Sequence, residues 1–78
     1  MAEGSKMHRV ISVMHLMSAT SHETSIKMED LVRLVQPMSW EEVSEVVRRC
    51  VELDYLREAG GRYFLTYKGQ LFAISINS

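Results

Sequence analysis

The chain has 78 residues, of which 46% are hydrophobic and 24% are charged, and its formal net charge is −1. This length fits one small domain, and the composition is typical of a globular protein rather than a disordered one. The near-neutral balance lacks the strong positive charge that is typical of nucleic-acid-binding proteins. No stretch approaches the roughly 20 apolar residues of a membrane-spanning helix.

The N-terminal residues and the cysteine content indicate a cytoplasmic setting. Residues 1–5 are mostly small or polar, so we expect a mobile start without the apolar segment of a signal peptide. Cys50 is the single cysteine, which excludes a disulfide within the chain and a cysteine metal cluster. It falls on the apolar side of a predicted helix, so we expect a core thiol in a reducing compartment.

The charge is unevenly distributed along the chain. Residues 1–24 are balanced, whereas residues 25–56 carry four basic side chains against seven acidic ones. Residues 57–78 carry Arg57, Arg62 and Lys68 against Glu58. We therefore expect contacts with an anionic partner to come mainly from the C-terminal part.

Two amphipathic helices are predicted in the first half of the chain. Apolar residues recur at spacings of three and four between about Ser5 and about Ser18, which predicts the first helix. A hydroxyl-rich loop follows, and Ile26 after it is expected to pair as a strand of one or two residues. The second helix has a buried stripe and ends at Gln36-Pro37, because a proline pushes the preceding residue out of the helical region. The stripe consists of Met28, Leu31, Val32 and Val35.

The stretch from Met38 to Leu53 predicts a third, well-specified helix. Ser39 and Glu42 have the spacing of a capping box, and Met38 and Val43 have that of a hydrophobic staple. One face of this helix is apolar and the other is charged. The short connection from the second helix predicts a helix-turn-helix. The apolar face consists of Val43, Val46, Val47, Cys50 and Leu53.

The pattern then changes to that of a hairpin and a short closing helix. Residues 55–58 and 62–65 predict two strands, joined by a turn at Ala59-Gly60-Gly61. Thr66 is expected to cap a fourth helix whose apolar residues face the core or a partner. Residues 73–78 alternate between apolar and small polar, so a final strand is the alternative for them. The apolar residues of the fourth helix are Tyr67, Leu71, Phe72 and Ile74.

Catalytic and metal-binding motifs are not found in the sequence. His8, His15 and His22 are seven residues apart, which on a helix is about 10 Å and too far for two imidazoles to share one ion. We therefore expect surface histidines. Metalloprotease, phosphate-loop and nucleophile motifs are missing, so we expect neither an enzyme nor a cofactor.

The order of these elements, together with two motifs, resembles a known family. Val43-x-x-x-Val47-x-x-Cys50-x-x-x-x-Tyr55-Leu56, and the end of the hairpin at Leu65-Thr66-Tyr67-Lys68-Gly69, are similar to the winged helix-turn-helix domains of small prokaryotic, especially archaeal, transcriptional regulators. The resemblance covers about residues 7–73. Asp54 stands where the family commonly has glycine, and Cys50 where it commonly has leucine. The resemblance implies one α+β domain over residues 1–78: a three-helix bundle, a two-stranded wing and a short C-terminal helix.

The resemblance also implies binding to double-stranded DNA and a role in transcription. In such domains the third helix, here about residues 40–53, enters the major groove, and the wing, here about residues 55–65, touches the DNA backbone. Carried over by position, the DNA contacts are Ser39, Trp40, Ser44, Glu45, Arg48, Arg49, Arg57, Arg62 and Lys68.

Two further expectations concern partners. The third helix is acidic, and its glutamates are also explained by the helix dipole and by ion pairs with its arginines, so a module that binds protein instead of DNA is the alternative. Trp40 fits stacking on a base, covering the turn or anchoring an interface. Apolar side chains on the terminal segments, and the two-fold operators of such regulators, favour a homodimer through the first helix and the C-terminal segment. These side chains are Met7, Met14, Met17, Leu71, Phe72 and Ile76.

Overall fold

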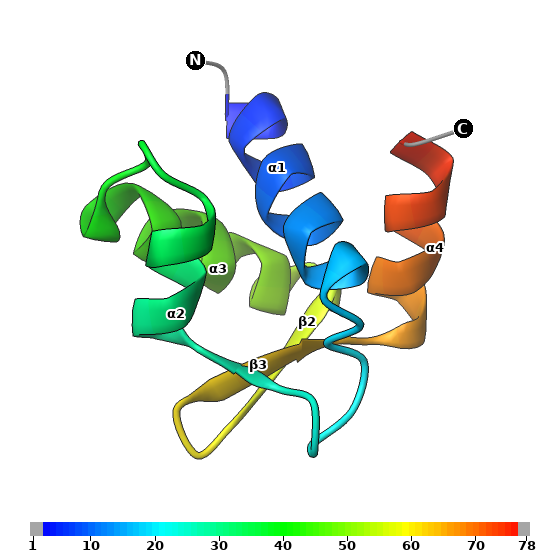
Figure 1. Cartoon of the computed structure of the whole chain (residues 1–78). Helices are drawn as coiled ribbons and strands as arrows, with labels where there is room; N and C mark the ends of the chain where they lie inside the picture. The colour runs from blue at the N-terminus through cyan, green and yellow to red at the C-terminus, as the bar shows by residue number, and fades with distance from the viewer. Residues whose placement is uncertain (1–2, 77–78) are drawn as a thin grey trace.

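Four helices and three short strands make up residues 3–76, the part of the chain that the computed structural model describes (Figure 1). They form a small α+β domain in which the strands make one antiparallel sheet. The elements follow the predicted order: α1 (Glu3–Leu16), β1 (Ile26–Lys27), α2 (Met28–Leu34), α3 (Trp40–Glu52), β2 (Leu56–Ala59), β3 (Arg62–Leu65) and α4 (Tyr67–Ile76).

Both ends of the chain differ from the sequence-based expectation. Residues 3–5, expected in a mobile start, belong to α1, whose side chains pack further along on the core. Residues 73–76 belong to α4, so the alternative of a final strand is wrong for these residues. Thr66 and Ala73 both favour the helix. The Thr66 hydroxyl caps the helix by accepting from the N–H of Gly69 at 3.0 Å, and Ala73 is fully buried on its inner face. Residues 1–2 and 77–78, which these expectations also included, lie outside the described residues.

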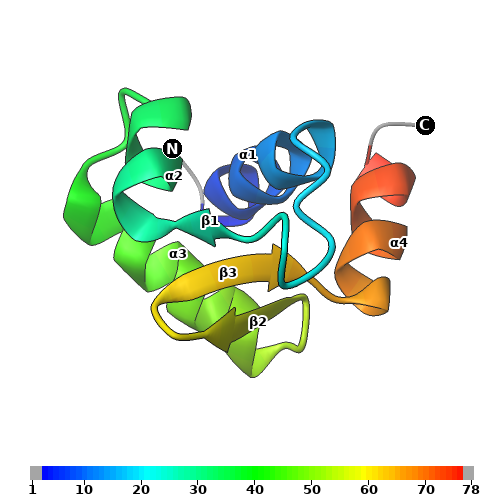
Figure 2. The same ribbon diagram turned by 60° about the horizontal axis from the view of Figure 1, so that its bottom comes forward.

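The sheet has the order β1-β3-β2, so the hairpin is joined by the two-residue strand that precedes α2. Ile26 pairs with Tyr63 and Lys27 with Arg62, whereas β2 and β3 pair from Leu56↔Leu65 to Ala59↔Arg62. Gly60 and Gly61 have φ values of 60° and 79°, which is the positive-φ pair of a two-residue turn that matches strand twist. Figure 2, in which the sheet comes forward, shows α1 and α3 behind it.

The core lies between α1, α3 and the sheet, and α1 packs against both α3 and α4. Cys50 is fully buried, and this burial raises the pKa of its thiol to about 12, so the prediction of a core thiol is confirmed. No helix within residues 3–76 is both long and apolar enough to cross a membrane. The fully buried large side chains come from α1, from α2 and the residue after it, from α3 and from the two hairpin strands: Val10, Ile11, Met14, Leu31, Val35, Val43, Val47, Cys50, Leu56 and Leu65.

The start of α3 has the predicted capping box. The Ser39 hydroxyl accepts from the N–H of Glu42 at 3.2 Å, and a Glu42 carboxylate oxygen accepts from the N–H of Ser39 at 2.9 Å. Lys6 of α1 lies 2.9 Å from the other carboxylate oxygen of Glu42. Two segments far apart in the sequence are therefore joined at this helix start.

Stability below neutral pH is expected to depend on Glu42. The backbone N–H of Ser39 and then the ammonium of Lys6 hold the pKa of Glu42 at about 2, below its ordinary value of 4.5. Because the folded-state pKa is lower, the carboxylate stabilises the fold above about pH 4.5, and this contribution is lost as the pH falls towards 2. Glu42→Gln keeps an oxygen that accepts from Ser39 but has no charge to lose. Its melting temperature should therefore fall less than that of the unmodified protein between about pH 5 and pH 2.

The matched control for this acid melting series is Glu41→Gln, because Glu41 lies in the same first turn of α3 but outside the capping box. It should keep the pH dependence of the unmodified protein. Parallel melting curves for Glu42→Gln and the unmodified protein would contradict the role given to Glu42.

α4 has one face packed against its neighbours and one face exposed. Phe72 packs inward, stacked on Tyr55 with ring centroids 4.7 Å apart, beside the buried Gly69 and Ala73. Tyr67, Leu71 and Ile74 are exposed, so they do not face the core, and the alternative that they face a partner stays a prediction. The reason is that the small residues Gly69 and Ala73 allow α4 to pack closely against α1 and β3.

Candidate nucleic-acid interface

α3 and the hairpin enclose two adjoining surface hollows, each of about 430 Å³. Met28, the first residue of α2, lines both. The tip hollow, beside the Gly60-Gly61 turn, is lined by Lys27, Met28, Glu29, Trp40, Gly60, Gly61 and Arg62. The helix–hairpin groove is lined by Met28, Ser44, Val47, Arg48, Val51, Glu52, Glu58 and Tyr63.

The tip hollow combines an exposed aromatic ring with positive charge. Trp40 is 52% exposed at the first position of α3. Lys27 is exposed and is the register partner of Arg62 on the adjacent strand. Backbone of the tight glycine turn completes the wall. This surface therefore offers two cations, one carboxylate from Glu29 and a stacking face at the junction of α3 and the hairpin.

Arg62 has a structural role that the sequence did not reveal. Its Nε donates to Oγ of Ser25 at 3.0 Å, and its Nη2 donates to the carbonyl oxygen of Ser25 at 2.9 Å. Ser25 is only 6% exposed and donates in turn to the carbonyl of His22. The guanidinium thus fastens β3 to the loop before β1, and only part of it remains available to a partner.

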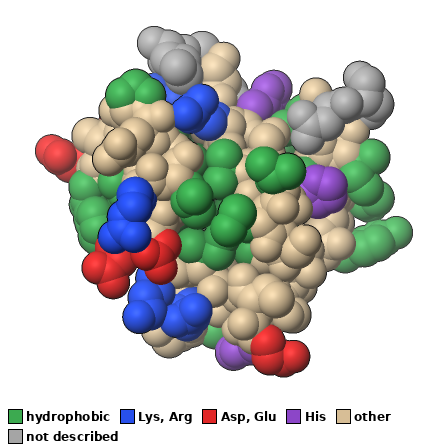
Figure 3. Space-filling model, in the orientation of Figure 1, with side chains coloured by type: hydrophobic (Ala, Val, Ile, Leu, Met, Phe, Trp, Pro, Cys, Tyr) green, Lys and Arg blue, Asp and Glu red, His purple; other side chains and the backbone are tan. Residues whose placement is uncertain are grey.

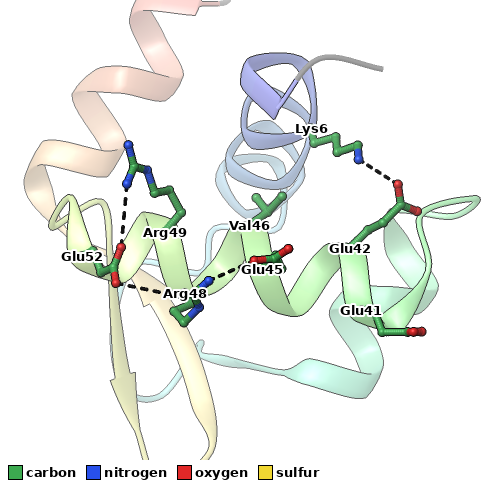
Figure 4. Close-up of a pocket in the computed structure, with 8 residues that line it drawn as sticks. All are labelled: Lys6, Glu41, Glu42, Glu45, Val46, Arg48, Arg49 and Glu52. Atoms are coloured by element: carbon green, nitrogen blue, oxygen red, sulfur yellow. Dashed lines mark hydrogen bonds and ion pairs between the residues drawn. The ribbon is translucent and has the colours of Figure 1, made fainter.

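The two arginines of α3 are paired with glutamates of the same helix (Figure 4). Arg48 lies 2.9 Å from Glu45 and 3.7 Å from Glu52, and Arg49 lies 3.9 Å from Glu52. These pairs confirm the ion-pair interpretation of the helical spacing. All four side chains are more than half exposed, so each pair contributes only about 0–1 kcal/mol. Such pairs rearrange readily when another anion arrives.

Figure 4 also shows the hollow between the start of α1 and the outer face of α3. Its volume is about 620 Å³, and four carboxylates and three cations line it around Val46. Lys6–Glu42 and the α3 ion pairs neutralise most of these charges. No three His, Cys, Asp or Glu side chains within the described part of the chain are arranged to hold a metal ion. This hollow therefore offers mixed surface charge, most of it already paired.

The remaining predicted contacts lie at the base of the hairpin. Arg57 lies 3.8 Å from Asp54, and both side chains are 65% exposed. Lys68 places its Nζ 5.3 Å from the ring centroid of Tyr55. Arg62 lies at the opposite end, beside the turn. The cations of the hairpin region are therefore divided between its base and its tip. Ser39, another predicted contact, lies at the start of α3, where its hydroxyl caps the helix.

Lys27 was missed in the sequence-based set of contacts. The sequence indicated a short strand at Ile26, but it gave no sign that this strand pairs with β3 and so brings Lys27 beside Arg62. His8 and His22 are exposed, as predicted, and His15 is partly exposed. His8 contacts Phe72 and His22 contacts Phe64, at 5.4 Å and 5.5 Å between ring centroids.

Comparison with protein-family models, with curated proteins and with solved structures finds no match for this chain. Function is therefore inferred from the chemistry and geometry of its own residues.

Proposed function

We propose that this chain is a winged helix-turn-helix protein that binds double-stranded DNA and acts in transcriptional control. Its support is the arrangement of α2 and α3 around a short turn, with the hairpin as a wing beside α3. The observation that carries the proposal is the tip hollow, where Lys27, Arg62 and Trp40 meet. A wing whose tip bears cations next to the start of an exposed helix suits a duplex, whose phosphates flank its grooves.

In this proposal, α3 enters the major groove and the hairpin tip follows the backbone. Arg48 and Arg49 exchange their weak pairs with Glu45 and Glu52 for DNA phosphates or guanine edges. The freed Glu45 accepts from the amino group of cytosine, which is how an acidic residue reads a base. The protein acts by binding, and no catalytic step is assigned to it.

Binding to random duplex DNA is expected to depend steeply on salt. Five exposed cations lie on β1, α3, β2 and the start of α4, namely Lys27, Arg48, Arg49, Arg57 and Lys68. If about three to five of them neutralise phosphates, log K falls against log salt with a slope of roughly −2.7 to −4.5. Fluorescence anisotropy with a labelled duplex, between low and physiological salt, measures this slope.

Single charge deletions refine the same titration. Lys27→Ala should weaken binding and bring the slope about 0.9 closer to zero. Arg33→Ala removes one equally positive, exposed side chain from α2 and should change neither quantity. Equal losses in the two variants would argue against a contact at Lys27, and no binding at low salt would refute the proposed function.

The second candidate is a module that binds protein, and the helix–hairpin groove favours it. Val51 is 38% exposed there, beside Met28 and Tyr63. Glu52 and Glu58 border these apolar side chains together with Arg48, so the charged edges carry a net charge of −1. An apolar floor with acidic edges suits a basic peptide better than a phosphate backbone. Absence of DNA binding at low salt, with Val51 still exposed in the folded protein, is the outcome that supports this candidate.

A further inference from the structure

Apolar side chains gather on a face that takes no part in the candidate DNA interface. Leu16, the last residue of α1, is 82% exposed, Met17 is 51% exposed, and Leu34 at the end of α2 is 41% exposed. Figure 3 shows hydrophobic side chains at the centre of this face, over α1 and α2. Single exposed apolar residues are ordinary on a protein surface, but a group of them marks an interaction surface.

A hollow of about 300 Å³ lies within the same face. Met17, Ile26 and Leu34 supply its apolar walls, and Ser25, Asp30 and Arg33 complete its lining. Asp30 and Arg33 form an ion pair at 3.5 Å, so the lining has no net charge. The face therefore has an exposed leucine, Leu16, and the next residue in the sequence, Met17, lines the apolar hollow.

We infer that this face binds a second copy of the chain, with Leu16 of each copy entering the hollow of the other. A two-fold interface uses the same surface on both subunits, so it requires a protrusion and a matching recess on one face. This face has both. Two linings without net charge also meet without repulsion.

The exposed area indicates a weak dimer. A standard interface buries about 800 Å² on each partner, which is roughly one sixth of the 4741 Å² surface of this chain. Leu16, Met17 and Leu34 are three partly exposed side chains, which cover only a minority of such an area. Surrounding polar surface must supply the rest, so the dissociation constant should be on the order of 10–100 µM.

Sedimentation equilibrium from about 5 µM to 1 mM, without DNA, tests this inference. The unmodified protein should form a dimer over this range, and Leu16→Glu should raise the dissociation constant at least tenfold. Leu16 is too exposed for this substitution to unfold the protein, and a thermal melt verifies it. Leu34→Glu should weaken the dimer as well.

The matched control is Leu71→Glu on α4, another half-exposed leucine and one that belongs to the C-terminal segment expected in the dimer. It should leave the dimer unchanged. A protein that stays monomeric at 1 mM, or a Leu71→Glu variant that dissociates as strongly as Leu16→Glu, would overturn the inference. Because no DNA is present, a negative result here leaves the DNA titration to be judged separately.

Discussion

Gly69→Ala is expected to lower the free energy of unfolding by about 3 kcal/mol, near the upper end of what overpacking costs. A Cβ at this position would overlap the carbonyl oxygen of Tyr55, and it would lie 3.0 Å from the carbonyl carbon of Tyr55 and 3.1 Å from Cδ2 of Leu65. The Tyr55 carbonyl cannot move away freely, because it accepts from the N–H of Thr66 at 3.0 Å. α4 would therefore have to move away from the sheet.

Thermal unfolding by circular dichroism measures this effect. A loss of 3 kcal/mol in a chain of this size lowers the melting temperature by about 12–24 °C. Gln70→Ala, at the next position of α4, is the control and should change it by only a few degrees. If Gly69→Ala melted together with Gln70→Ala, the close approach of α4 to Tyr55 would be incorrect.

Arg62→Ala is expected to cost about 2 kcal/mol of stability, whether or not DNA is present. It removes two hydrogen bonds from a charged donor and leaves the carbonyl of the buried Ser25 without its guanidinium partner. At a urea slope of about 1 kcal/mol/M, the denaturation midpoint should fall by about 2 M. Arg62 therefore holds the hairpin in position before it contacts any partner.

Arg57→Ala is the matched control for Arg62→Ala, since it removes an arginine of the same hairpin. Its exposed pair with Asp54 contributes little, so its midpoint should shift by less than about 0.5 M. Equal midpoints for the two variants would show that Arg62 is an ordinary surface arginine. If Arg62→Ala is destabilised and Arg57→Ala is not, a weaker DNA affinity of Arg62→Ala reflects a displaced hairpin as well as a lost charge.

The elements with local signals were predictable from the sequence. The capping box of α3 depends on Ser39 and Glu42, three residues apart, and the hairpin turn depends on Gly60 and Gly61. The ion pairs of Arg48 likewise follow from helical spacing. Asp54 has a φ of 65°, a left-handed conformation that aspartate adopts more readily than most residues.

Features that depend on contacts between distant segments were not predictable. The pairing of β1 with β3 brings Lys27 into the site, and Arg62 bonds to Ser25, which is 37 residues away in the sequence. The orientation of α4 follows from its approach to Tyr55 at Gly69, not from the positions of its large apolar residues. In each case local pattern identified the element but not its neighbours.

The most direct test of the proposed function is a titration of ¹⁵N-labelled protein with a random DNA duplex at low salt, followed by amide chemical shifts. We predict the largest changes on the outer face of α3, at Lys27 and around the Gly60-Gly61 turn, and small changes along α4. Spectra that do not change in excess DNA, or changes confined to α1 and α4, would contradict DNA binding by α3 and the hairpin.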